Sequence, residues 1–116
     1  MPETIEAKIL SDADKLDAVG AVGVARAFMQ AGKAGAPLYS NADIETYKRT
    51  NLDENGRCIK EKLHAANLEY ELKLKRIGDR LFTPLAQTVF EQRIRFMDMF
   101  FAALRKEITG TDLRSL

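Results

Sequence analysis

Twelve residues near the start of the chain, from Ala18 to Met29, are apolar or glycine except for Arg26. The run is about half as long as the ~20 residues that a membrane span needs, which favours a buried helix in a cytoplasmic protein. It is apolar on nearly every side. We therefore expect a helix enclosed by neighbours rather than one with a single buried face.

We predict one helix over residues 4–30, which contains this apolar run. Gly20 and Gly23 fall on the same helical face as Leu16 and Ala27. A glycine inside a helix costs ~1 kcal/mol relative to alanine. Two glycines on one stripe therefore indicate the close approach of another helix. Gly32 occupies the position expected for a C-cap.

Two further helices are predicted near 54–77 and 84–108, where apolar residues recur at spacings of three and four. Thr83-Pro84 is typical of a helix start, since threonine caps and proline fits the first turn. The turn formers of residues 31–53 predict a long loop with at most one short helical turn near 44–48. No segment shows the alternation of apolar and polar residues that is typical of a β-strand.

The whole chain, residues 1–116, is therefore predicted to be a single all-α unit with three long helices and a flexible tail at 111–116. Two neighbouring helices cannot enclose the apolar first helix. This mismatch predicts a further partner, which is either a missing part of the chain or another copy in a homo-oligomer.

Composition excludes several classes of site. The net charge of +1 argues against nucleic acid or an anionic membrane as a partner. The single cysteine, Cys58, excludes an internal disulfide and a multi-cysteine zinc site, and the single histidine, His64, excludes a site built mainly on imidazole. The acidic N-terminus lacks the apolar core of a signal peptide.

The strongest chemical signal is the acidic run Asp12-Ala13-Asp14-Lys15-Leu16-Asp17, which directly precedes the apolar segment. Carboxylates beside a core are costly unless their charge is offset. A divalent cation would offset it, because hard cations prefer oxygen ligands. The other interpretation is a solvated helical turn whose aspartates interact with the helix dipole.

The segment from Ile9 to Phe28, which contains D-A-D-K-L-D-A-V-G-A-V-G-V-A-R, resembles the last motif of the HD superfamily of metal-dependent phosphohydrolases. It is closest to a small bacterial group of HD-domain hydrolases. Weaker similarity follows at 32–39, Lys73-Leu74, 79–83 and 92–97. The resemblance implies a helical HD-domain fold, a divalent metal (Mn, Mg or Fe), and hydrolysis of phosphate esters or nucleotide anhydrides.

In that family the metal is held by a histidine, a His-Asp pair and a later aspartate, and the later aspartate matches Asp14. The histidines belong upstream, yet only thirteen residues precede Asp14, and His64 lies downstream without a following aspartate. The resemblance therefore implies the C-terminal half of an HD domain, without a catalytic residue of its own and inactive or nearly so alone. Met1 would then be an artificial, truncated or internal start.

Other residues receive weaker assignments. Asp12 and Asp17 are candidates for groups that hold a metal ligand or a water molecule in place. The alternatives are a solvated helical turn for Asp12 and an ion pair with a lysine for Asp17. Arg26 and Lys73 are candidate contacts for a substrate phosphate; the alternatives are an ion pair for Arg26, which is expected to be buried, and a solvated side chain for Lys73. Arg93 is interpreted as part of a structural ion pair.

Two functions remain open at this stage. One is an HD-type phosphohydrolase that acts on a small phosphorylated or nucleotide substrate once its N-terminal half is present. The other is a non-catalytic helical interaction module that persists as a homo-oligomer. His64 is interpreted as a boundary residue, Cys58 as a passive thiol, and the cluster of phenylalanines after residue 89 as core.

Overall fold

The computed structural model describes residues 3–115, and the predicted all-α fold is confirmed. The α-helices are α1 (Ile5–Leu16), α2 (Gly20–Lys33), α3 (Ile44–Asn51), α4 (Ala66–Leu72) and α5 (Pro84–Thr109). Short 3-10 helices are η1 (Glu61–Leu63), η2 (Leu74–Arg80) and η3 (Thr111–Ser115). In the described part, Leu52 and Cys58 form an isolated β-bridge and no strand is present. Leu116, the end of the predicted tail, lies outside the described residues.

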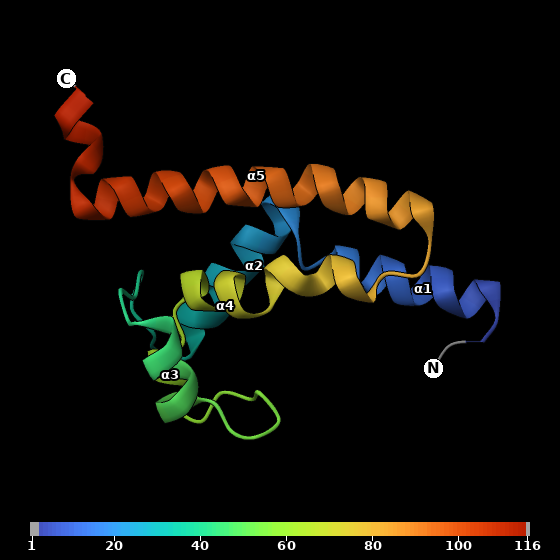
Figure 1. Cartoon of the computed structure of the whole chain (residues 1–116), viewed down its shortest axis with the longest axis horizontal. Helices are drawn as coiled ribbons and strands as arrows, with labels where there is room; N and C mark the ends of the chain where they lie inside the picture. The colour runs from blue at the N-terminus through green and yellow to red at the C-terminus, as the bar shows by residue number, and fades with distance from the viewer. Residues whose placement is uncertain (1–2, 116) are drawn as a thin grey trace.

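The long helix α5 lies along one side of the molecule, and α1, α2 and η2 pack against it (Figure 1). Its predicted bounds are confirmed to within one residue. The Thr83 hydroxyl accepts a hydrogen bond from the Ala86 amide at 3.2 Å and so caps the first turn. Gly110 ends the helix with a φ of 74°, a left-handed conformation that glycine adopts without a Cβ penalty.

The predicted single helix over 4–30 is wrong, because the chain turns a corner between α1 and α2. Val19 is extended, and Gly20 has a φ of 86°. At Gly23, an added Cβ would lie 2.3 Å from the Ala18 carbonyl oxygen. The two glycines therefore permit a tight corner. The predicted close approach of another helix is found at Gly20, where an added Cβ would lie 3.0 Å from Arg93 Cγ on α5.

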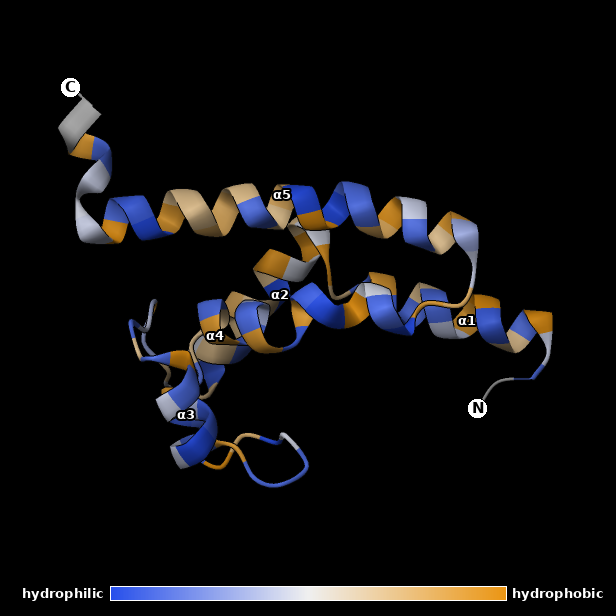
Figure 2. Cartoon of the chain, in the orientation of Figure 1, coloured by the Kyte–Doolittle hydropathy of each residue, from blue (hydrophilic) through white to orange (hydrophobic). Residues whose placement is uncertain are grey.

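The apolar segment is covered on one side only, as expected if two neighbouring helices cannot enclose it. Val24, Ala27 and Ala31 are buried, whereas Val22 is 63% and Met29 is 75% exposed. Only α5 and α4 pack extensively on α2, so its other side faces outward. Apolar residues recur along α1 as well (Figure 2), and Ile5, Ile9 and Leu10 on that helix are exposed.

The predicted helix over 54–77 begins only at Ala66, and its second half continues as η2. A turn replaces the first residues of the predicted helix, because Asp53 Oδ1 accepts hydrogen bonds from the amides of Asn55 (2.8 Å) and Arg57 (2.9 Å). Gly56 completes this turn with a φ of 78°. The predicted loop over 31–53 contains the helical turn expected near 44–48, which continues to Asn51 as α3.

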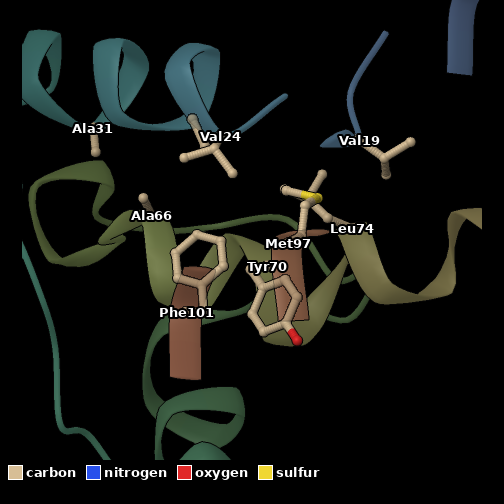
Figure 3. Close-up of a cluster of buried hydrophobic side chains, with 9 residues drawn as sticks. Val19, Val24, Ala31, Ala66, Tyr70, Leu74, Met97 and Phe101 are labelled. Carbon is tan, nitrogen blue, oxygen red and sulfur yellow. The ribbon is translucent and has the colours of Figure 1, made fainter. Parts of the chain in front are cut away.

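The core lies between α2, α4 and α5 (Figure 3). Tyr70 stacks on Phe101 with ring centroids 4.4 Å apart, and Met97 is fully buried beside them. Phe101 and, in part, Phe90 and Phe100 meet the expectation of core phenylalanines, but Phe96 is 45% exposed.

None of the helices in the described residues is long and apolar enough to cross a membrane.

Candidate functional site

The aspartates of the acidic run have different environments on α1. Asp12 is buried, with 3% of its surface exposed, whereas Asp14 and Asp17 are exposed. Residues two apart in a helix are separated by ~200° around its axis, so Asp12 and Asp14 face opposite ways. The sequence run is therefore not a single cluster of carboxylates.

Asp12 joins α1 to the start of α5. Its carboxylate accepts hydrogen bonds from the amides of Phe82 (2.8 Å) and Thr83 (2.9 Å) and from the Thr83 hydroxyl (2.8 Å). Burial raises the pKa of Asp12, but these hydrogen bonds and the charge of Lys15 outweigh burial and hold the pKa below its ordinary value of 3.8. Both oxygens thus have a structural role that the sequence did not indicate.

The described residues do not fit a complete metal site. Within residues 3–115, no three His, Cys, Asp or Glu side chains are arranged so that they could share an ion. Asp14, the predicted metal ligand, is an exposed carboxylate on the outer face of α1, and Asp17 follows at the end of that helix. Structural metal sites generally need several such ligands.

The two arginines near the corner bind backbone carbonyls. The Arg93 guanidinium donates to the Leu16 carbonyl at 2.8 Å, and the Arg26 guanidinium donates to the Asp17 carbonyl at 3.3 Å. Carbonyls at the end of a helix lack intrahelical partners, so both arginines stabilise the end of α1. The expectation that Arg26 is buried is wrong, and the contact of Arg93 is structural but is not an ion pair.

An open groove of about 680 Å³ lies between the second half of α2 and residues 57–73. Its floor includes Ala27, Ala31 and Ala66. Its polar side chains are Lys33, Arg57, Cys58, Glu61, His64, Glu69 and Lys73, together with Gln30. Lys73, a predicted phosphate contact, therefore lines this groove, whereas Arg26, its predicted companion, does not.

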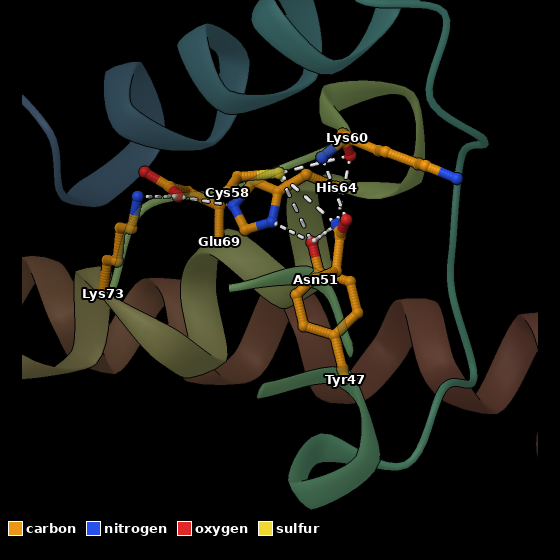
Figure 4. A network of polar contacts seen from close by, with 7 residues as sticks. All are labelled: Tyr47, Asn51, Cys58, Lys60, His64, Glu69 and Lys73. Atoms are coloured by element: carbon orange, nitrogen blue, oxygen red, sulfur yellow. Dashed lines mark hydrogen bonds and ion pairs between the residues drawn. The ribbon is translucent and has the colours of Figure 1, made fainter. Parts of the chain in front are cut away.

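A polar network on one wall of the groove centres on His64 (Figure 4). The Tyr47 hydroxyl lies 2.6 Å from His64 Nδ1, and Glu69 Oε1 lies 2.7 Å from His64 Nε2. The Asn51 amide donates to the Tyr47 hydroxyl at 2.9 Å. Because that hydroxyl accepts from Asn51, it is free to donate to Nδ1, which leaves the Nε2 proton for the Glu69 carboxylate.

This network orders the groove wall. Burial raises the pKa of Tyr47 to about 12, so its hydroxyl remains a donor at neutral pH. Burial raises the pKa of Glu69, but the hydrogen bond from His64 and the charge of Lys73 outweigh it and lower the pKa overall. His64 is thus a boundary residue, as predicted, yet both its nitrogens are held. These two hydrogen bonds were not predicted from the sequence, because the partners of His64 are 5 and 17 residues away.

Replacement of Tyr47 by phenylalanine is expected to lower the free energy of unfolding by about 1–2 kcal/mol, because His64 Nδ1 and the Asn51 amide lose a partner. Urea unfolding measures the change. Tyr39→Phe is the matched control, since no hydrogen bond of the Tyr39 hydroxyl is found in the described residues. Equal effects of the two substitutions would contradict the role of the Tyr47 hydroxyl.

The helical arrangement is an HD-like all-α fold, as comparison with solved structures shows. An HD-superfamily hydrolase from Bacillus thuringiensis matches with a TM-score of 0.68 and 28% identity, over 91% of this chain and 47% of that chain.

The chain is also similar to the uncharacterised protein YpgQ of Bacillus subtilis, with 39% identity over 111 residues, 96% of this chain and 44% of YpgQ. The crystal structure of YpgQ in complex with ADP matches with a TM-score of 0.68 and 35% identity, over 95% of this chain and 49% of that chain. No protein-family model matches the sequence. The chain spans about half the length of these relatives.

Proposed function

We propose that this chain is the aspartate-bearing part of an HD-type metal-dependent phosphohydrolase, with Asp14 as its metal ligand. The observation that carries the proposal is the position of Asp14, which stands before Lys15-Leu16 in the motif and is exposed on the outer face of α1. Similarity to an HD-superfamily hydrolase supports the reaction class. The complex of YpgQ with ADP supports nucleoside phosphates as the substrate class.

The contribution of this chain is the presentation of Asp14. Asp12 fixes α1 against the start of α5, and Arg26 and Arg93 fix the end of α1, so the orientation of the Asp14 face is set by contacts on the opposite side and at the corner. The remaining ligands are proposed to come from a part that corresponds to the uncovered half of the relatives. No step of hydrolysis is assigned to the described residues, because no three of their His, Cys, Asp or Glu side chains are placed to share a metal ion.

The test is a chimera in which the uncovered half of B. subtilis YpgQ is joined to this chain. The chimera is expected to hydrolyse nucleoside triphosphates when Mn²⁺ is added. Asp14→Asn should lower this activity by at least about tenfold, since loss of even a group that only supports a metal ligand costs ~10–100-fold. Asp112→Asn, which changes an exposed aspartate on η3, should have no effect.

Two results would overturn the proposal. Hydrolysis of nucleotides by the isolated chain with Mn²⁺ would show that no further part is needed. Full activity of the Asp14→Asn chimera would show that Asp14 is not a ligand. Thermal unfolding of each variant separates a lost ligand from a lost fold, because Asp14 is exposed and its substitution should not change stability.

The outward apolar side chains support a second candidate, a helical module that associates with another copy. Leu10 on α1 is 71% exposed, and Val22 and Met29 on α2 are 63% and 75% exposed. Exposed apolar surface is typical of interaction sites. Light scattering decides between the candidates: a stable dimer of the isolated chain that persists in the chimera favours the module, and a dimer that dissociates when the YpgQ half is joined favours the hydrolase.

A further inference from the structure

Residues 40–64, which we call the α3 lid, lie outside the hydrophobic core. The cluster of core side chains between α2, α4 and α5 includes none from this segment, and within residues 3–115 α3 packs extensively on no other helix. Figure 1 shows α3 and the loop after it projecting from the rest of the molecule, below α4. A segment with few buried apolar contacts opens at a lower free energy than the core does.

The lid is held together by its own hydrogen bonds. The buried Asn51 side chain donates to the Tyr47 hydroxyl at 2.9 Å and to the Lys60 carbonyl at 3.1 Å, and its Oδ1 accepts from the Lys60 amide at 2.9 Å. The backbone carbonyl of Asn51 accepts from the Ile59 amide at 2.8 Å. The Tyr47 hydroxyl also binds His64 at 2.6 Å. These contacts connect α3 with the loop and with His64, so the lid can move as one body.

The lid is attached to the rest of the described chain through two side chains of α4, apart from contacts between adjoining residues at its ends. Asn67 donates to the Ser40 carbonyl at 2.7 Å and accepts from the Ser40 amide at 3.0 Å. Glu69 binds His64 Nε2 at 2.7 Å (Figure 4). Both attachments are polar and partly exposed, and the net contribution of such hydrogen bonds to stability is modest.

Open space borders the lid on two sides. The groove of about 680 Å³ lies between residues 57–64 of the lid and the second half of α2. A second groove, of about 580 Å³, lies between the start of the lid, at residues 40–44, and the second half of α5. A body that is fixed to α4 and flanked by two grooves has room to turn toward α2 or toward α5.

We propose that residues 40–64 open and close as one lid, with Asn67 and Glu69 of α4 as its points of attachment. Residues 57–64 form one wall of the groove beside α2, so the position of the lid sets the width of that groove and the exposure of its floor at Ala27 and Ala31. The chain enters the lid through residues 36–39, which form no helix or strand, as is usual for a hinge. The lid goes beyond the proposed function, because its movement requires neither Asp14 nor a metal ion.

Hydrogen exchange of the Ser40 amide, measured by NMR on the full chain without metal, tests whether the two attachments open together. Glu69→Ala removes the attachment at His64 and leaves Ser40 and its partner Asn67 unaltered. If the lid moves as one body, the Ser40 amide should exchange about fivefold faster in this variant, which is the typical effect of one lost hydrogen bond on an equilibrium. In the parent chain, Ser40 should also be less protected than Met97 in the core, because the lid opens while α5 stays folded.

Two control variants lie on the same helix. Glu71→Ala removes a carboxylate that pairs with Lys75 and should leave the exchange of Ser40 unchanged. Glu69→Gln keeps an oxygen that accepts from His64 and should exchange at close to the parent rate. Circular dichroism checks that each variant is folded. If Glu69→Ala is not, Glu69→Asp repeats the test, because its carboxylate ends one methylene short of His64.

Either of two results would overturn the lid. An unchanged exchange rate of Ser40 after loss of the Glu69 carboxylate would show that the two attachments open separately. Equal protection of Ser40 and Met97 in the parent chain would show that the lid opens only when the whole chain unfolds. Neither measurement depends on hydrolysis, so failure of the lid and failure of the proposed hydrolase are distinguished.

Discussion

Replacement of Asp12 by alanine is expected to lower the free energy of unfolding by about 3 kcal/mol. The amides of Phe82 and Thr83 lose their acceptor at a partly buried position, together with the Thr83 hydroxyl. Each buried polar group left without a partner costs about 1–3 kcal/mol. Because the contact spans 70 residues of sequence, its loss releases α1 from the start of α5. Chemical denaturation of the two proteins measures the difference.

The same contact predicts a pH dependence. Since the pKa of Asp12 is lower in the folded state than its ordinary value of 3.8, its contribution to stability is complete above that value and is lost as the pH falls through the folded-state pKa. As the pH is lowered, the free energy of unfolding of Asp12→Ala should therefore fall less than that of the parent chain. Asp14→Ala is the control on the same helix, and a similar destabilisation by it would contradict this role for Asp12.

Replacement of Gly23 by alanine is expected to cost about 2–3 kcal/mol, because the new Cβ would lie 2.3 Å from the Ala18 carbonyl oxygen and 2.5 Å from its carbon. The clash involves backbone atoms, so no side-chain rotation relieves it. The corner between α1 and α2 must open instead, which moves α1 away from α5. The thermal midpoint and the unfolding free energy both report the change.

Gly32→Ala is the matched control in the same helix. No atom lies within 4 Å of a Cβ built at Gly32, and its φ is not positive. Alanine there should stabilise the chain by about 0.5–1 kcal/mol, because it has the higher helix propensity. If both substitutions stabilise, the close approach at Gly23 does not exist in solution.

The acidic run shows how far the site could be predicted. Its residue types indicated carboxylate chemistry, and the motif singled out Asp14. The burial of Asp12 was missed, because its partners Phe82 and Thr83 lie beyond any local pattern. The groove was missed as well, since its lining residues come from α2 and from residues 57–73, which share no pattern in the sequence.

The sequence by itself determined the helical class and the bounds of α5, because the signals at Thr83-Pro84 and Gly110 act within one turn of the backbone. Only the tertiary structure decided where the first predicted helix breaks. Helical periodicity continues through residues 17–20, but Arg93 binds the Leu16 carbonyl from α5 and Gly20 adopts a positive φ at the corner. The second predicted helix failed for a similar reason. Tyr47, Asn51 and His64 satisfy one another across α3 and the following loop, and these hydrogen bonds between distant residues outweigh the local helical pattern.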